Sequence, residues 1–328
     1  MLLSMTSRIL PIVALVSLAA VLQAQPQGTI DGPVAGYVFD KAAHGLRPVL
    51  GLPSASLLGS PIKWRDRVDQ LFIAPKLDST VGVTSEGAFR LFRLRDGIAT
   101  ELAIGGLAPA GSPYSLAYSP SGSSVALYGG NRVQLVTGLP DAPVVGGSID
   151  LTAAGVPSGL AVSDDATTLL VSVNNSIRLF ESYADMGKLI DTASGALVAF
   201  AAGGHDAAVA DAGAGVMLFH DLVGAGASQV IAPPDDNGTA FSALAFSADG
   251  KALFLASSTA QAVTQLDLAS GSRTRIACNC SPTVLARMGS VFRLTELSGD
   301  PLWLLDAPER APRIVFVPAY ESRPFAPR

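Results

Sequence analysis

One segment of the sequence organises the rest. Residues 242–278 (SALAFSADGKALFLASSTAQAVTQLDLASGSRTRIAC) contain four short strand-like runs separated by turn residues. Asp249 and Gly250 form the clearest turn, because an Asp side chain accepts bonds from nearby amides and Gly adopts positive φ without steric cost. The first two runs are apolar, the third alternates, and the fourth is polar. The segment therefore predicts four strands of decreasing burial, at 243–246, 252–256, 263–268 and 274–277.

Weaker copies of this segment recur along the chain. The equivalent positions in the first strand of each copy are Ile73, Tyr118, Val162, Phe200, Phe246 and Ala286. A period of roughly 40–45 residues with four strands per period is typical of a β-propeller and not of a helical solenoid. The gradient of burial agrees, because neighbouring blades cover the inner strands of a propeller blade and its outer strand meets water. The sequence thus predicts an all-β propeller of four-stranded blades.

The number of blades depends on residues 33–51. The runs 36–40 and 46–50 resemble the last two strands of a blade whose first two strands are missing, and six full blades follow between Arg67 and Val317. Residues 319–328 are short and rich in Pro, which makes them a poor source of strands to complete the blade. We therefore expect seven blades, one of them incomplete. The alternative is six blades plus an N-terminal hairpin.

The pattern SADGKALFLAS at 247–257, followed by VTQLDLASG at 263–271, resembles the YVTN, TolB and WD40-like repeats of bacterial extracytoplasmic proteins. No Trp-Asp pair closes the third strands, so a true WD40 repeat is not expected. Proteins with such repeats include scaffolds, binding proteins, lactonases and quinoprotein dehydrogenases. The resemblance therefore implies an architecture and leaves the chemistry open.

The N-terminus predicts export. Arg8 precedes an apolar run at 9–22, and cleavage after Ala24 would remove a signal peptide covering residues 1–24. The alternative is an uncleaved anchor. Residues 25–328 are expected to form a single propeller domain, secreted or periplasmic, with no transmembrane span once the signal is removed. The net charge of −5 comes without a basic stripe, so we expect no nucleic-acid partner.

Few residues suggest chemistry, and we identify no catalytic or metal-binding constellation in the sequence. Cys278 and Cys280 are expected to form a disulfide in an oxidising compartment, with free thiols or a link to a partner as alternatives. Asp235 and Asn237 lie in an oxygen-rich loop that would suit Ca²⁺, but the loop lacks the regular spacing of a calcium motif. We therefore expect no cofactor. Ca²⁺ at this loop is the alternative to a solvated acidic turn.

A binding surface is expected at one end of the propeller. The loops that join blades and the turns between second and third strands gather there. Trp64 is its least ordinary member, since an indole beside cationic side chains can stack a sugar or peptide group; the alternative is a Trp that covers a seam between blades. The candidate rim residues are Trp64, Arg65, Glu86, Asn131, Arg132, Asn174, Asn175, Asp235 and Asn237.

These observations favour an exported, non-catalytic propeller that binds a protein, peptide or glycan through one rim. The alternative is an enzyme of the lactonase or quinoprotein type with a metal or cofactor at the mouth of the channel. Such an enzyme needs several carboxylates or histidines converging on one point. The sequence offers few candidates for this arrangement.

Overall fold

The structure is a computed structural model. It describes residues 32–62, 64, 68–183, 187–193, 195–211, 215–224, 226–232, 240–308 and 311–319. The expected signal peptide, residues 1–24, lies outside this part of the chain. No helix within the described ranges is long and apolar enough to span a membrane.

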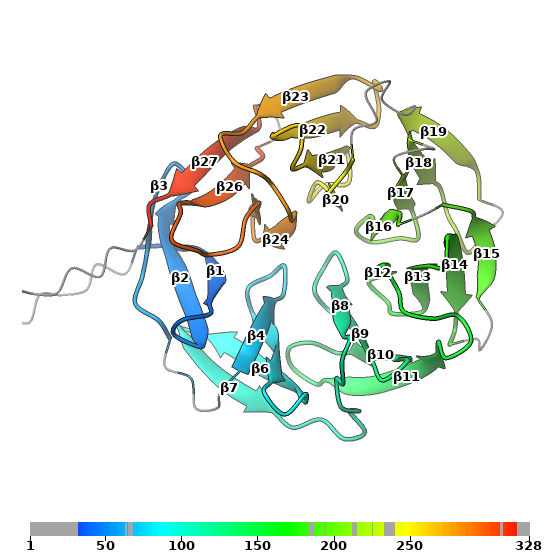
Figure 1. Cartoon of the computed structure of the whole chain (residues 1–328), viewed down its shortest axis with the longest axis horizontal. Coiled ribbons are helices and arrows are strands. Elements are labelled where there is room, and N and C mark those ends of the chain that lie inside the picture. Colours follow the sequence, from blue (N-terminus) through cyan, green and yellow to red (C-terminus); the bar gives the residue numbers. More distant parts are fainter. Residues whose placement is uncertain are drawn as a thin grey trace, which may run out of the picture. The chain divides into compact units, whose positions relative to one another are not determined.

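Seven antiparallel sheets are arranged around a central axis as the blades of a β-propeller (Figure 1). Blade 1 has three strands, β1 (Val34–Asp40), β2 (Gly45–Leu52) and β3 (Ala55–Leu58). Blade 2 consists of β4 (Val68–Ile73), β5 (Ser79–Thr84), β6 (Phe89–Arg95) and β7 (Ile98–Leu102). Blade 3 consists of β8 (Ser115–Tyr118), β9 (Val125–Gly129), β10 (Arg132–Thr137) and β11 (Val144–Asp150). Blade 4 consists of β12 (Gly159–Val162), β13 (Thr168–Val173), β14 (Ser176–Glu181) and β15 (Lys188–Asp191). Blade 5 consists of β16 (Leu197–Phe200), β17 (Ala207–Asp211), β18 (Gly215–Phe219) and β19 (Ser228–Ala232). Blade 6 consists of β20 (Ala243–Phe246), β21 (Ala252–Ser257), β22 (Ala262–Asp267) and β23 (Arg273–Ala277). Blade 7 consists of β24 (Ala286–Met288), β25 (Val291–Arg293), β26 (Leu302–Asp306) and β27 (Arg313–Val317).

The prediction of seven blades with one incomplete is confirmed, but the missing part was placed wrongly. β1 and β2 are the first two strands of blade 1, not the last two. β1 lies beside β4 and β24, the innermost strands of the neighbouring blades, and β2 pairs with β3 on its outer side. The blade therefore lacks an outermost strand within the described residues. β3 was missed because it has only four residues and follows β2 after a short turn.

The gradient of burial within a blade follows the predicted order from the second strand outwards, but not at the first strand. The first strand is mostly half-buried, as in β20, because it lines the channel. Every residue of β21 is buried, whereas β23 on the outside of the same blade is mostly exposed. The apolar core lies between blades instead of at one centre. One cluster, for example, joins Tyr128 and Leu135 of blade 3 to Leu169 and Val171 of blade 4. Each blade is thus stabilised by its two neighbours, as in other repeat architectures.

An ion pair holds the first hairpin of blade 1. The Arg47 guanidinium donates to the Asp40 carboxylate, and each side chain is only 11% exposed. The other oxygen of Asp40 accepts the backbone amides of Ala42 (2.9 Å) and Ala43 (3.0 Å) in the turn between β1 and β2. Arg47 also donates to the carbonyl of Gly59, at 3.2 Å. The pair therefore fixes both the turn and the segment that follows β3.

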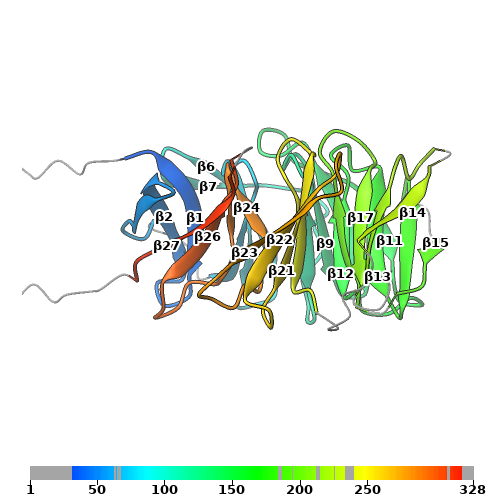
Figure 2. The same cartoon turned by 90° about the horizontal axis from the view of Figure 1, so that it is seen from above.

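The strands run between two faces of the folded unit (Figure 2). We call the "turn face" the one that carries the turns between first and second strands and between third and fourth strands. The opposite "connection face" carries the turns between second and third strands and the connections from one blade to the next. On the connection face, Ala88 of a second-to-third-strand turn forms a bridge with Pro109 of a blade-to-blade connection. The two kinds of loop therefore lie together on that face, as the repeat pattern implies.

Candidate functional site

Trp64 lies at the seam between blades 1 and 2. Its ring makes an edge contact with Phe92, with 4.6 Å between ring centroids, and it packs against a cluster that includes Leu46 and Leu71. Its Nε1 is buried and has no hydrogen-bond partner among the described residues. The indole is therefore part of the packing between two blades. Its neighbour Arg65 lies outside the described residues.

Glu86, Asn131 and Arg132 are exposed on the connection face, at the turns of blades 2 and 3. The connection at 103–114 runs beside them and is held by Gln134, a buried amide. The Gln134 side chain accepts the amide of Ala108 (2.6 Å) and donates to the carbonyl of Gly106 (2.9 Å). The buried Gln134 thus fixes this loop, and the exposed side chains of Glu86, Asn131 and Arg132 lie next to an ordered segment.

Asn174 and Asn175 occupy the turn between β13 and β14, both with positive φ (47° and 58°), a region that Asn tolerates better than most residues. The Asn174 amide donates to the carbonyl of Ala154 at 2.6 Å, in the connection at 151–158. Both residues are exposed, and Asn174 is therefore an anchor for this loop at the surface, with Asn175 beside it. The remaining candidates, Asp235 and Asn237, fall outside the described residues, as does the predicted calcium loop.

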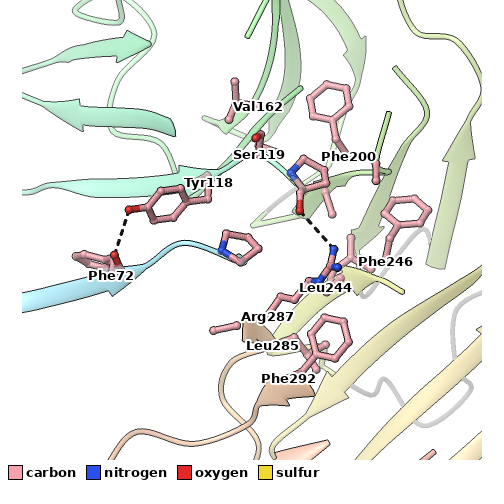
Figure 3. A pocket seen from close by; sticks show the side chains of 18 of the residues that line it. Phe72, Tyr118, Ser119, Val162, Phe200, Leu244, Phe246, Leu285, Arg287 and Phe292 are labelled. Carbon is pink, nitrogen blue, oxygen red and sulfur yellow. Dashed lines mark hydrogen bonds between the residues drawn. The ribbon is translucent and has the colours of Figure 1, made fainter. Parts of the chain in front are cut away.

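The structure contains a cavity of about 330 Å³ on the propeller axis (Figure 3). It is surrounded by the innermost strands of all seven blades, and the side chains at its wall are mainly aliphatic and aromatic. Those labelled in Figure 3 are Phe72, Tyr118, Ser119, Val162, Phe200, Leu244, Phe246, Leu285, Arg287 and Phe292. Tyr118 donates to the carbonyl of Phe72 at 3.2 Å, and burial raises the pKa of this phenol, so it remains protonated at neutral pH.

Backbone groups contribute to the wall as well. Ser119 donates its amide to the carbonyl of Ser124 at 3.0 Å where the first hairpin of blade 3 closes, and Ser247 makes the same bond to Ala252 at 2.8 Å in blade 6. Hydrogen-bonded pairs alternate along an antiparallel ladder. The N–H and C=O of the preceding residues, such as Tyr118 and Phe246, therefore point away from the second strand and towards the channel. The backbone therefore adds hydrogen-bond donors and acceptors to the cavity wall, besides those of the side chains.

Arg287 is a charged side chain at the cavity wall. It belongs to β24 of blade 7, and it donates to the carbonyl of Pro120 in blade 3 (3.4 Å; Figure 3) and to that of Gly289 (3.1 Å). The amide of Gly289 donates in turn to Pro75 of blade 2, at 2.8 Å. The hairpin between β24 and β25 is therefore bonded to the turns of blades 2 and 3 at the turn-face end of the cavity.

Asp164 of blade 4 extends this network. Its carboxylate accepts the amides of Ser121 in blade 3 (2.6 Å) and Gly203 in blade 5 (2.9 Å). Burial acts to raise the pKa of Asp164, but these hydrogen bonds outweigh it and hold the pKa below its usual value. Burial lowers the pKa of Arg287, and the charge of Asp164 opposes that shift. Arginine keeps its charge at neutral pH, so the turn-face end of the cavity carries a part-buried cation.

Other titratable groups lie away from the cavity. His205 is 3.3 Å from Asp165, and His220 is 3.2 Å from Asp206, each at a solvent-facing turn. Neither histidine lines the cavity. No three His, Cys, Asp or Glu side chains of the described residues converge where they could share a metal ion.

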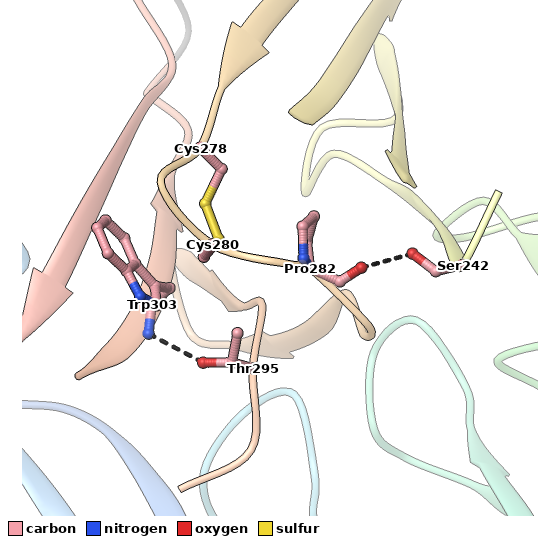
Figure 4. The surroundings of a disulfide bond; sticks show 6 residues. All are labelled: Ser242, Cys278, Cys280, Pro282, Thr295 and Trp303. Carbon is pink, nitrogen blue, oxygen red and sulfur yellow. Dashed lines mark hydrogen bonds between the residues drawn. A yellow bond between two sulfur atoms is a disulfide. The ribbon is translucent and has the colours of Figure 1, made fainter. Parts of the chain in front are cut away.

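Cys278 and Cys280 are joined in a disulfide, with their Cα atoms 5.0 Å apart (Figure 4). Both are buried beside Phe254 and Phe292, at the start of the connection from blade 6 to blade 7. The same connection is tied to blade 6 by the Ser242 hydroxyl, which donates to a backbone carbonyl at 2.6 Å (Figure 4). This loop leads into β24 and therefore helps to position Arg287.

Sequence reasoning missed Arg287, which lies at the turn-face end of the channel, opposite the predicted rim surface. One signal was present in the repeat. By strand register, Arg287 pairs with Phe292 and occupies in blade 7 the place that Tyr118 has in blade 3 and Phe246 has in blade 6. A cation where these copies carry aromatic residues marks a blade with a different role at the axis.

Comparison with known proteins identifies the fold. No family model matches the sequence, and no curated protein matches it. Similar solved structures include a protein from Lactobacillus plantarum, with a TM-score of 0.60, 14% identity and coverage of 87% of this chain and 96% of that one. A candidate 6-phosphogluconolactonase from Bacteroides fragilis gives 0.59, 15%, 89% and 96%, and the Cps50 (Swd1) β-propeller domain of Myceliophteria thermophila gives 0.51, 13%, 81% and 94%. At these identities the likeness concerns the fold alone, and the chain is a seven-bladed β-propeller like the WD40-type and lactonase-like propellers.

Proposed function

We propose that this chain is an exported, non-catalytic propeller that binds a protein, peptide or glycan through its connection face. The observation that carries the proposal is the fixed surface on blades 2 to 4. Buried Gln134 holds the connection at 103–114, and Asn174 holds the connection at 151–158. A surface that is ordered before binding loses less conformational entropy when a partner docks.

The exposed residues of this surface suit a polar partner. Glu86, Asn131, Arg132 and Asn175 lie on successive blades of one face, and Val156, which is 52% exposed, adds an apolar contact beside them. Mixed polar and apolar character of this kind is usual in interfaces that form and dissociate. The surface carries both signs of charge, so it favours a partner with a matching charge pattern over a simple polyanion or polycation.

The enzyme alternative has weaker support. A lactonase or quinoprotein mechanism requires acids, bases or metal ligands that converge on a substrate. The side chains at the cavity wall are aliphatic and aromatic, and the polar ones among them are mainly hydroxyls and arginine. The two Asp–His pairs of the described chain face solvent at separate turns.

The test compares two charge-swapped variants of the full chain. The first, Glu86→Lys/Arg132→Glu, reverses the charges of these two residues on the connection face. The matched control, Glu101→Lys/Arg273→Glu, reverses one charge of each sign on the outer strands. The wild-type chain is cross-linked in the native extracytoplasmic fraction, and the captured partner is identified, produced and titrated against all three proteins. We expect the connection-face variant to bind at least tenfold more weakly and the control to bind within twofold of the wild type.

Equal binding by the two variants would remove the connection face from the proposal. A second measurement tests the enzyme alternative directly. The wild-type chain is incubated with lactones in the presence of Ca²⁺ or other divalent ions, and with sugars in the presence of a quinone cofactor. Turnover that depends on the chain would replace the proposed function with a catalytic one.

A further inference from the structure

The cation at the axial cavity, Arg287, contacts no carboxylate among the described residues. Arg287 lines the cavity, yet both of its hydrogen bonds within the described residues go to backbone carbonyls. No carboxylate of the described chain lies within 4.0 Å of its guanidinium, the distance that defines the ion pairs found elsewhere in the molecule. A part-buried charge is costly unless it is paired. An anion in the cavity would supply the missing partner.

Arg293 provides an internal comparison. It also lines the cavity, and it comes from β25, the strand next to β24. Its guanidinium forms an ion pair with Glu296, and it is therefore neutralised within blade 7. Of the two arginines at the wall, only Arg287 retains donors directed at the cavity without a carboxylate to receive them. Within the described part of the chain, two of its five N–H donors are used, by the carbonyls of Gly289 and Pro120.

Asp164 does not cancel this charge. It acts on Arg287 at long range, but its two oxygens are already bonded to the amides of Ser121 and Gly203. Asp164 is not among the residues that line the cavity, whereas Arg287 is. The guanidinium is therefore the charge that a molecule in the cavity would meet.

The size and wall of the cavity restrict the anion. At about 30 Å³ for each water molecule of the liquid, a cavity of 330 Å³ holds a molecule of about ten non-hydrogen atoms. Ligand sites in proteins begin at about this volume. The wall beyond Arg287 is formed largely by apolar side chains, including Phe246, Leu244 and Leu285 (Figure 3). An apolar body is favoured there, because it removes this surface from water.

We propose that the axial cavity is a binding site for a small amphipathic carboxylate, with the acid group held by Arg287 and an apolar body of eight or so carbons along the inner strands. Channel-facing backbone amides near Tyr118 and Phe246 would assist the carboxylate, as donors at fixed positions. This site is separate from the connection-face surface. If octanoate does not bind in the cavity, the proposed function of the connection face is unaffected. If no partner binds the connection face, the proposal for the cavity is unaffected.

The first experiment measures the ligand class by isothermal titration of the full chain. Octanoate is the probe, because its ten non-hydrogen atoms match the cavity. Octylamine has the same length with the opposite charge, and gluconate has the same acid group on a polar body. We expect octanoate to bind with one-to-one stoichiometry and at least tenfold more tightly than either comparator. Equal binding of octylamine would refute the role of the charge, and equal binding of gluconate would refute the apolar body.

The second experiment locates the acid group. Arg287→Gln removes the charge and keeps much of the side-chain length, Arg287→Lys keeps the charge, and Arg273→Gln is a matched control on the exposed outer strand of blade 6. We expect Arg287→Gln to bind octanoate at least tenfold more weakly than the wild type does. Arg287→Lys should bind it with intermediate affinity, and Arg273→Gln with the affinity of the wild type. Unchanged affinity in a folded Arg287→Gln variant would overturn the assignment.

A third measurement needs no variant and covers the case in which Arg287→Gln fails to fold. A photoreactive octanoate with a diazirine in its chain is cross-linked to the wild-type chain, and the labelled peptides are identified. Labels are expected in the inner-strand segments 116–120, 244–247 and 285–287, which meet at the cavity. Labels confined to the outer strands, or no octanoate binding by the wild type at all, would overturn the proposal.

Discussion

The ion pair between Asp40 and Arg47 provides a direct test of how the incomplete blade is held. Both side chains are 11% exposed, so neither charge can be fully hydrated if its partner is removed. Asp40→Asn removes the charge but keeps an oxygen that can accept the turn amides of Ala42 and Ala43. The substitution therefore isolates the ion pair from the turn.

The expected loss follows from this geometry. Breaking a buried ion pair by removing one partner costs about 3–5 kcal/mol, and the remaining exposure places this pair near the lower end, at about 3 kcal/mol. The folded unit begins at Gly32, and its described residues extend to 319. At roughly 2 cal/mol/K of unfolding entropy per residue, a unit of that length loses about 5 °C in melting temperature.

Three variants measured by urea and thermal unfolding complete a double-mutant cycle: Asp40→Asn, Arg47→Met and the double variant. We expect each single change to cost about 3 kcal/mol and the double change to cost little more than one of them, because it leaves no unpaired charge. Hydrogen exchange should show the loss concentrated in β1 and β2. A coupling energy below about 0.5 kcal/mol would refute the argument that the two charges depend on each other.

The same pair gives a dependence on pH. Burial acts to raise the pKa of Asp40, but the bonds from Arg47 and the turn amides outweigh it and lower the pKa below the usual 3.8. The stability that Asp40 contributes is therefore fully present above that usual value, and it is lost as the pH falls through the lowered pKa. The difference between wild type and Asp40→Asn should shrink in that acidic range. A difference that stays constant there would contradict the shift.

Two further changes test other parts of the propeller. In Gly129→Ala the new Cβ would lie 1.8 Å from the carbonyl oxygen of Ala110, so the connection at 103–114 must move. We expect urea unfolding to show a loss of about 1–3 kcal/mol in the free energy of unfolding. The control Gly105→Ala, whose new Cβ meets nothing within 4 Å, should have little effect. In Asp165→Asn the change concerns a carboxylate whose burial is outweighed by bonds from Ser163 and Thr167 and by His205, which lower its pKa to about 2. Half of this side chain is exposed, so solvent screening limits the effect; melting temperatures should differ at neutral pH and converge as the pH falls through about 2.

The repeating parts of the fold were predictable because their signals are local. The turn at Asp249 and Gly250 and the buried run at 252–256 both correspond to observed structure, since Asp249 accepts the Ser247 hydroxyl at 2.7 Å in that turn. Blade 1 was harder because its identity depends on long-range contacts. Whether a pair of strands is inner or outer is decided by its neighbours β4 and β24, and the sequence of β1 does not contain that information.

The candidate site was less predictable than the fold. Asn174 was selected as a polar residue in an exposed turn, which is correct for its position, but its amide is used by Ala154 of another loop. Arg287 was overlooked because it lies in a short strand, and its importance depends on Pro120, 167 positions earlier in the chain. The sequence shows which residues are polar. It does not show which of them a neighbouring blade has already engaged.

The channel-facing backbone of the inner strands limits how this protein can change over time. Apart from a change to proline, which has no N–H, a mutation can replace a side chain but cannot remove the amide or carbonyl that Tyr118 or Phe246 presents towards the axis. The hydrogen-bonding character of the channel is therefore inherited with the fold. New preferences for a ligand can arise mainly at the few positions, such as Arg287, where a side chain crosses the opening. A single repeat that differs from the others is therefore enough to give an otherwise uniform channel a preference for one class of ligand.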